Sequence, residues 1–314
     1  MMNLKKPKFW DYKRINLFAY FLLPIAFLIQ LKNFFKIKSK KKLKIKTICI
    51  GNIYIGGTGK TSLSIKINEI LKKKGIKACF IKKFYKNQID EQRLLRSKGK
   101  LFSSLNRLDA INQAISQNYE IAILDDGLQD YTINYDIKLV CFNNLNWIGN
   151  GLTIPAGPLR ENLKNLEKYQ DVFINGNEEN VENIKKIILK INSKINIYVG
   201  KYKPININEF DKTNKYLVFS GIGNHKTFIS MIKNYGLNVC KDLEFPDHYN
   251  YKNEDIKKIL RLSEDMNCKI ITTEKDYLRL NNNKLDKIKY IKSDLHIFDE
   301  DRFINHILKT NESN

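Results

Sequence analysis

The chain has 314 residues, 43% of them hydrophobic, which is enough for one large domain or two of medium size around a real core. Lys and Arg outnumber Asp and Glu by 55 to 33, and the formal charge of +22 favours anionic partners such as a membrane surface, nucleic acid or phosphorylated substrate. Part of that charge is compositional, because lysine is spread along the whole chain. Five scattered cysteines without a CxxC pair, and four histidines without ligand spacing, predict reduced core cysteines and no structural zinc.

Residues 1–42 differ in character from the rest. Residues 17–29 carry no charge and are interrupted only by Pro24, but a membrane-spanning helix needs ~20 apolar residues. Lysines and aromatic residues flank this run on both sides. The pattern predicts a membrane-associated helix that lies in an anionic cytoplasmic leaflet. The alternative is a plain N-terminal core helix beside a solvated lysine run.

A glycine-rich stretch, GNIYIGGTGKT at residues 51–61, lies between a predicted strand at 43–50 and a predicted helix at 62–73. Glycines let backbone N–H groups curl around a phosphate, and the helix N-terminus adds its positive dipole end. The strict P-loop pattern requires glycine where Tyr54 stands, so the alternative is an ordinary glycine turn. The strand–turn–helix context favours the P-loop.

The P-loop interpretation assigns roles to six residues. The Lys60 ammonium should reach the β- and γ-phosphates of ATP, and the Thr61 hydroxyl should bind Mg²⁺. The remaining nucleotide contacts would come from the backbone of Gly56, Gly57, Thr58 and Gly59.

After the P-loop the chain alternates strands and helices, which predicts a parallel sheet with helices on both faces. The expected elements are strands at 78–81, 121–124 and 137–142 and a helix at 108–116. The strand expected at 121–124 ends in Asp125-Asp126, where a nucleotide-binding fold places its Mg²⁺ carboxylates. A surface Asp-Gly turn is the alternative.

Two further stretches offer candidate site residues. The Gly- and Pro-rich residues 149–161 predict a fixed loop ending in Arg160, which could clamp a phosphate, and Glu161, which could reach the metal. On composition alone this is a structured linker. Asp90-Glu91 follows the second strand and could supply a base, although helix N-terminal acids are the simpler interpretation.

A polar hinge near residues 175–177 is the expected domain boundary, so that residues 43–175 form a P-loop domain and 176–314 a second α/β domain. The second half alternates again. Its expected elements are helices at 181–191, 226–235, 255–266 and 302–309 and strands at 195–199, 217–219, 237–240 and 269–271. In this half, Asp247-His248 is a candidate acid–base pair, against the alternative of a surface histidine.

Seven motifs in this order carry a resemblance to a known family: GNIYIGGTGKTS, DEQRLL, DDGLQD, GNGLTIPAGPLRE, FSGIGN, FPDHY and TTEKDYLRL. Together they resemble the tetraacyldisaccharide 4'-kinases (lipid A 4'-kinases), over essentially the whole chain. The resemblance implies two α/β/α domains, with a P-loop NTPase-like parallel sheet in the first and the second closing the active-site cleft. It also implies transfer of the ATP γ-phosphate to the 4'-hydroxyl of tetraacyldisaccharide 1-phosphate, giving lipid IVA at the cytoplasmic face of the inner membrane.

The resemblance also assigns residues. Lys60 and Thr61 would hold the phosphates and Mg²⁺, Asp125 and Asp126 would serve Mg²⁺ and catalysis, and Glu161 would belong to the metal shell. The resemblance makes Asp90 the base and His248 the residue that pairs with it. No obligate protein partner is expected.

This chain departs from the family pattern at three places. Tyr54 replaces a small hydroxyl residue, Asp130 replaces a frequent histidine, and Lys83-Phe84-Tyr85-Lys86 replaces Arg-Gly-Tyr-Gly. There, Lys83 could stand in for the arginine as a point charge.

Two rival functions come from other classes. A membrane-associated P-loop ATPase switch would hydrolyse ATP without a lipid acceptor, but the PAGPLRE and FPDHY motifs argue against it. A nucleic-acid-binding module would explain the charge, yet no recognition motif is present and the charge is densest beside the apolar helix.

Overall fold

The computed structural model describes residues 7–12, 14–34, 43–85, 88–176, 180–280 and 285–309. They divide into two compact units. The smaller unit comprises residues 88–94 and 202–296, and the larger unit comprises the rest. The expected boundary at 175/176 therefore falls inside the larger unit, because the strand after it pairs with the same sheet as the strand before it.

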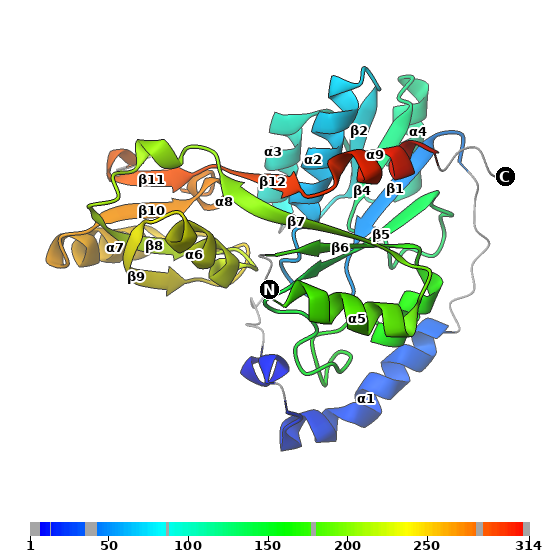
Figure 1. Cartoon of the computed structure of the whole chain (residues 1–314), viewed down its shortest axis with the longest axis horizontal. Helices are drawn as coiled ribbons and strands as arrows, with labels where there is room; N and C mark the ends of the chain where they lie inside the picture. The colour runs from blue at the N-terminus through cyan, green and yellow to red at the C-terminus, as the bar shows by residue number, and fades with distance from the viewer. Residues whose placement is uncertain are drawn as a thin grey trace. The chain divides into compact units, whose positions relative to one another are not determined.

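The larger unit is built on an eight-stranded sheet in the order β12-β7-β6-β5-β1-β4-β2-β3 (Figure 1). The strand pairs from β7 to β3 are all parallel, which confirms the predicted parallel α/β fold. The strands are β1 (Lys46–Gly51), β2 (Ala78–Lys83), β3 (Leu101–Ser104), β4 (Ile121–Asp125), β5 (Ile137–Asn143), β6 (Asp171–Asn175), β7 (Asn196–Pro204) and β12 (Ser293–Ile297). The chain passes between the units along β7 and β12.

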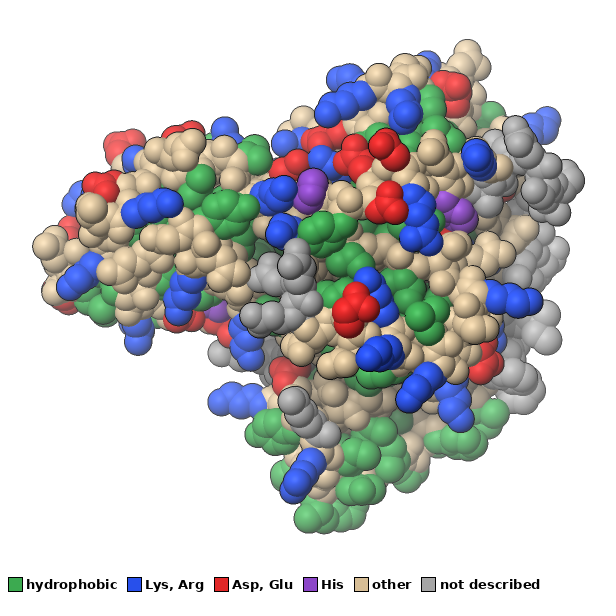
Figure 2. All heavy atoms as spheres, viewed as in Figure 1, with side chains coloured by type: hydrophobic (Ala, Val, Ile, Leu, Met, Phe, Trp, Pro, Cys, Tyr) green, Lys and Arg blue, Asp and Glu red, His purple; other side chains and the backbone are tan. Residues whose placement is uncertain are grey.

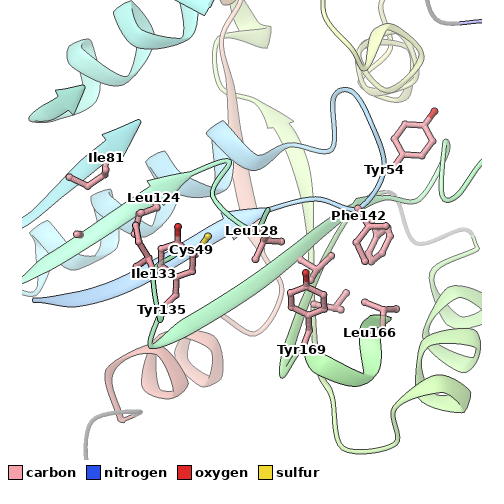
Figure 3. Close-up of a cluster of buried hydrophobic side chains, with 14 of the residues drawn as sticks. Cys49, Tyr54, Ile81, Leu124, Leu128, Ile133, Tyr135, Phe142, Leu166 and Tyr169 are labelled. Carbon is pink, nitrogen blue, oxygen red and sulfur yellow. The ribbon is translucent and has the colours of Figure 1, made fainter. Parts of the chain in front are cut away.

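Helices cover both faces of this sheet, and Figure 1 shows α5 and α9 on opposite sides. The helices that lie wholly or partly in this unit are α1 (Leu17–Phe34), α2 (Lys60–Lys73), α3 (Ile89–Lys98, which begins in the smaller unit), α4 (Arg107–Ser116), α5 (Val181–Ile191) and α9 (Glu300–Lys309), with 3-10 turns at Lys8–Asp11 and Leu163–Lys168. Residues of α4 and α5 share one buried cluster with alternate strand residues such as Cys49 and Phe142 (Figure 3). On the other face Phe303 of α9 packs against Phe173 and Tyr198.

The smaller unit has a four-stranded parallel sheet in the order β11-β10-β8-β9. Its strands are β8 (Lys215–Ser220), β9 (Asn238–Glu244), β10 (Lys269–Thr273) and β11 (Ile288–Ile291), and its helices are α6 (His225–Asn234), α7 (Asn253–Asp265) and α8 (Glu274–Tyr277), with 3-10 turns at Ile207–Glu209 and Leu285–Lys287. Because successive strand residues face opposite sides, the sheet has a buried cluster on each face.

The cysteines correct one expectation. Cys49, Cys79 and Cys141 are buried and free, as predicted, but Cys240 and Cys268 are joined as a disulfide. The Cα atoms of this pair lie 7.6 Å apart, wider than the ~4.4–6.8 Å usual for a disulfide. Cys240 is the extra residue of a β-bulge in β9, because Tyr216 and Leu217 of β8 pair with Val239 and Lys241. The disulfide therefore starts from a position where the strand pairing is irregular.

Helix α1 exposes most of its apolar side chains. Ala19 and Ala26 are buried, and Gln30 Nε2 donates to the Arg160 carbonyl (3.2 Å), whereas Phe18 and Phe21 are more than two-thirds exposed. Figure 2 shows hydrophobic side chains gathered over α1 in the lower part of the view. Among the described helices, none combines the length and apolarity needed to cross a membrane. The basic flank expected at 36–42 lies outside the described residues.

Candidate functional site

The loop between β1 and α2 turns at Gly56 (φ 107°) and Gly59 (φ 86°), a backbone region that favours glycine. Asn52 Nδ2 donates to the Gly56 carbonyl (3.1 Å). The Ile55 N–H donates to the Pro158 carbonyl (2.8 Å), so the Pro-rich loop of the larger unit braces this one. Gly57 lies half-buried between the two turns, and α2 begins at Lys60 directly after Gly59.

Tyr54 shows why the missing P-loop glycine is tolerated. It is not among the residues with positive φ, and it forms an antiparallel bridge with Leu159, so this position does not need glycine. Its ring is buried, and its hydroxyl donates to Asp11 Oδ1 (3.3 Å). Tyr54 therefore attaches the loop to Leu159 and Asp11, while the turns themselves are made by Gly56 and Gly59.

Asp125 is in direct contact with one other predicted metal residue, Thr61. Asp125 ends β4, fully buried, and its Oδ2 accepts from the Thr61 hydroxyl (3.2 Å) and from Lys82 Nζ (2.6 Å). Its Oδ1 is buried and has no hydrogen-bond partner among the described residues. A buried carboxylate oxygen without a partner is costly, whereas a hard cation prefers such oxygen ligands. The arrangement therefore fits a divalent cation.

Asp126 is held by Arg160. Its backbone is left-handed (φ 64°), and its carboxylate accepts from Arg160 Nη1 (2.7 Å) and Nη2 (3.3 Å). Burial raises the pKa of the Asp126 carboxyl, but the charges of Lys60, Arg160 and Lys82 outweigh burial and hold that pKa well below its usual range. Asp126 is therefore ionised at neutral pH. Arg160 is engaged with it, and its contact with a phosphate stays a prediction.

Glu161 lies in a buried hydrogen-bond network. Its oxygens accept from Gln129 Nε2 (2.9 Å), Asn165 Nδ2 (3.2 Å) and the Tyr169 hydroxyl (3.2 Å). Gln129 also accepts from Arg160 Nη1 (3.0 Å), so it connects the two ends of the predicted Arg-Glu pair. In this structure Glu161 orients Gln129, and its role as a metal ligand stays a prediction.

Sequence reasoning missed two residues beside the P-loop. Asn175, at the end of β6, donates from Nδ2 to the Thr58 carbonyl (2.5 Å), and both side chains are buried. Lys82, at the end of β2, makes the buried ion pair with Asp125. Their positions at strand ends could have indicated a role in the site, because ligands of parallel α/β sheets bind beyond the carboxyl ends of the strands.

In the smaller unit, Asp90 and His248 meet as the family resemblance implies. Asp90 lies in the first turn of α3, and both of its carboxylate oxygens are 3.1 Å from His248 Nδ1. The His248 backbone is left-handed (φ 59°), and its N–H donates to the Gly221 carbonyl (3.1 Å). Asp247 is more exposed and lies 3.9 Å from His248 Nε2.

Two cations that sequence reasoning did not single out complete this cluster. Arg279 donates to Asp90 from Nε (3.0 Å) and from Nη2, and Lys275 Nζ lies 3.5 Å from Asp90 and 3.0 Å from Glu91. Burial raises the pKa of the Asp90 carboxyl, but the His248 hydrogen bond and the charges of Lys275 and Arg279 hold it well below its usual range. The signal was present in TTEKDYLRL, which contains both cations.

The other two departures from the family pattern also have local explanations. Asp130 accepts from Arg107 Nη1 (3.1 Å) and from the Thr132 hydroxyl (2.6 Å), so a carboxylate suits the position. Lys83 is half-buried, with its ammonium 5.7 Å from the centre of the Tyr85 ring.

Comparison with known proteins agrees with the motifs. Residues 17–312 match a family model described as tetraacyldisaccharide-1-P 4'-kinase. The chain is 60% identical to a tetraacyldisaccharide 4'-kinase of Pelagibacter ubique (strain HTCC1062) over the full length of both chains. It is 32% identical to one of Rickettsia canadensis (strain McKiel), covering 90% of this chain and 91% of that protein.

The fold has a solved counterpart. The crystal structure of LpxK from Aquifex aeolicus, in complex with ATP, aligns with a TM-score of 0.68. The alignment covers 94% of this chain and 99% of that one at 21% sequence identity. At this identity the likeness concerns the fold, and it agrees with the parallel sheets described above.

Proposed function

This chain belongs to the tetraacyldisaccharide-1-P 4'-kinase family, the kinases of lipid A biosynthesis, and on that premise we propose which of its residues carry the reaction. In the proposed reaction the bond between the γ-phosphorus and the β,γ-bridging oxygen of ATP breaks. A new bond forms from that phosphorus to the 4'-hydroxyl oxygen of tetraacyldisaccharide 1-phosphate. The products are ADP, lipid IVA and the proton of the hydroxyl.

The observation that supports this proposal most is the contact between Thr61 and Asp125 at the P-loop. In P-loop enzymes the hydroxyl and a strand-end carboxylate hold the metal that accompanies ATP. Here Asp125 Oδ1 is buried without a partner among the described residues, so Thr61 and Asp125 would hold Mg²⁺. When bound, Mg²⁺ neutralises charge that develops on the β- and γ-phosphate oxygens.

The nucleotide phosphates would lie on the loop that precedes α2. The backbone N–H groups of Gly56 to Gly59 and the helix N-terminus offer positive partial charge, and Lys60 adds a full charge. Asp126 keeps Arg160 beside this loop through its two hydrogen bonds. We assign Asp126 and Glu161 to the surroundings of the metal, with Glu161 acting through Gln129.

Asp90 is the proposed acceptor of the hydroxyl proton. Its low pKa keeps the carboxylate ionised, which a base requires, but also makes it a weak base. A weak base is sufficient, because phosphoryl transfer passes through a loose transition state in which the attacking hydroxyl keeps most of its proton. His248 fixes the carboxylate through the contacts of its Nδ1 with both Asp90 oxygens.

The acceptor carries acyl chains, so the enzyme needs access to a membrane. The exposed apolar side chains of α1 offer a surface that would lie in the lipid headgroup region, and the positive charge of the chain suits an anionic leaflet. We propose peripheral attachment to the cytoplasmic face of the inner membrane.

The test is transfer of radiolabel from [γ-³²P]ATP to tetraacyldisaccharide 1-phosphate in detergent micelles containing Mg²⁺. Labelled lipid is expected with the unmodified chain, and it should disappear with Lys60→Ala and in the presence of EDTA. Release of labelled inorganic phosphate without labelled lipid would instead support an ATPase switch. An active Lys60→Ala protein would refute the P-loop assignment.

A further inference from the structure

The side chain of Lys82 is the feature of the larger unit that the assigned roles leave unexplained. It is 3% exposed, and its Nζ lies 2.6 Å from Asp125 Oδ2. Burying an ammonium costs solvation free energy, which a partner must offset. One such partner is the Asp125 carboxylate oxygen that also accepts from the Thr61 hydroxyl (3.2 Å).

The sheet explains why Lys82 reaches this place. Strands β2 and β4 are parallel neighbours in which Ile81 pairs with Leu124, so Lys82 and Asp125 come next to each other at the carboxyl ends. The residues before them, Ile81 and Leu124, belong to the buried cluster on one face of the sheet. Since successive side chains of a strand point to opposite faces, Lys82 and Asp125 point to the other face. Since Thr61 contacts Asp125 there, Lys82 lies at the start of α2, beside the phosphate loop.

We propose that Lys82 binds the terminal phosphate of ATP, in addition to neutralising Asp125 before the nucleotide arrives. This inference rests on the proposed function. A divalent cation and the Lys82 ammonium compete for the same carboxylate, so a cation held by Asp125 would weaken this ion pair, and an anion that enters with the cation would replace the lost negative charge beside Lys82. The anion that enters with the cation is the nucleotide, and its terminal phosphate is the part that shares the metal.

Lys83 is the rival candidate, because the family pattern places an arginine at that position. It follows Lys82 in the same strand, so its side chain points to the other face of the sheet. Its ammonium lies 5.7 Å from the centre of the Tyr85 ring. The structure therefore assigns the phosphate-directed charge to Lys82.

The experiment compares ATP with ADP, which lacks the terminal phosphate. Dissociation constants are measured by isothermal titration calorimetry with Mg²⁺ for the full-length chain, Lys82→Met, Lys83→Met and Lys73→Met. Loss of one charged hydrogen bond should weaken ATP binding of Lys82→Met about tenfold and ADP binding less than about threefold. Lys73→Met removes an exposed charge at the end of α2 and should leave both constants unchanged.

Each other outcome has a defined meaning. Equal weakening of ATP and ADP would overturn the proposal and leave Lys82 as a structural partner of Asp125. A selective loss of ATP affinity in Lys83→Met, but not in Lys82→Met, would overturn it in favour of Lys83. If Lys82→Met does not fold, Lys82→Gln keeps a donor for Asp125 without the charge, and the same comparison applies. Failure of the unmodified chain to bind ATP would refute the proposed function itself.

Discussion

Arg279 donates a hydrogen bond from Nε to Asp90 Oδ2 (3.0 Å) while its Nη1 donates to the Gly221 carbonyl (2.6 Å) and to Asp276 Oδ1 (2.9 Å). Asp276 is fully buried and also accepts from the Tyr251 hydroxyl (2.9 Å). Arg279 thus ties the proposed base to two other segments of the smaller unit. It fixes the direction of the carboxylate and lowers its pKa, so it is a positioning residue for Asp90.

Replacing this arginine should affect turnover more than nucleotide binding. We expect Arg279→Met to lower kcat about 100-fold, within the range that a positioned base supplies, with ATP affinity changed less than about twofold. Since Arg279 helps to hold the Asp90 pKa low, its removal should raise that pKa. The acid limb of the pH–kcat profile should then move to higher pH.

Arg279→Lys is the conservative control. It keeps a positive charge near Asp90 but cannot make the same set of hydrogen bonds. The acid limb should stay near its original position while kcat recovers only in part. An unmoved acid limb in Arg279→Met would show that Asp90 is not the group whose ionisation limits the rate.

The pair of Asp126 and Arg160 should make stability depend on acid pH. The folded-state pKa of Asp126 is depressed, so its contribution to stability is complete above its unfolded-state pKa of ~3.9 and is lost as pH falls toward the folded-state value. Urea unfolding of the unmodified chain and Asp126→Asn between about pH 6 and 3 measures this contribution. The difference in unfolding free energy should shrink as the pH falls.

Asp109→Asn, at an exposed carboxylate, controls for the change of side chain. A constant Asp126 difference across this range would contradict the depressed pKa.

Much of the fold followed from local patterns. The helix expected at 181–191 has those bounds in the structure, and the strand–turn–helix around the P-loop differs by a few residues at its ends. The short strands β3 and β11 were missed, because four residues of mixed polarity give too little periodicity. The domain boundary was misplaced because a polar hinge marks a surface turn, whereas unit membership depends on which sheet the next strand joins.

The candidate site was predictable where its residues lie in recognisable motifs at the ends of neighbouring strands. Thr61 and Asp125 meet because strand order brings β1 beside β4, a consequence of the parallel α/β pattern. For Lys82, Asn175 and Arg279 the sequence shows a strand-end position or a motif, but it does not show their contacts, which are made with residues distant in sequence. A lysine within a strand ordinarily indicates an exposed edge, and here burial opposite a carboxylate decides otherwise.

Asn175 should prove important for the phosphate loop. Asn175→Asp keeps the shape of the side chain, but replaces the donor to the Thr58 carbonyl with a second acceptor. Because both groups are buried, we expect a loss of about 1–3 kcal/mol in unfolding free energy and a weaker affinity for ATP. Urea unfolding and calorimetry with ATP measure the two effects. Reduced stability with unchanged ATP affinity would restrict Asn175 to a structural role.

The exposed face of α1 should decide membrane attachment. Phe18 and Phe21 are 71% and 74% exposed and stand three residues apart, on neighbouring positions of one helix face. Each phenylalanine that enters the lipid interface contributes up to about 1.5–3 kcal/mol. The double variant Phe18→Ser/Phe21→Ser should therefore bind vesicles at least about tenfold more weakly in flotation assays with anionic lipid.

The matched control removes two exposed apolar residues elsewhere in the chain. Leu105 and Ile205 are 75% and 65% exposed and lie outside α1, so Leu105→Ser/Ile205→Ser tests whether any loss of surface apolarity weakens binding. Its vesicle affinity should equal that of the unmodified chain. Both variants should phosphorylate a short-chain, micelle-independent acceptor at the normal rate, because α1 would deliver the lipid rather than take part in transfer. Equal vesicle binding by the two double variants would reject α1 as the attachment surface, and a loss of transfer to the soluble acceptor would show that α1 supports the active site itself.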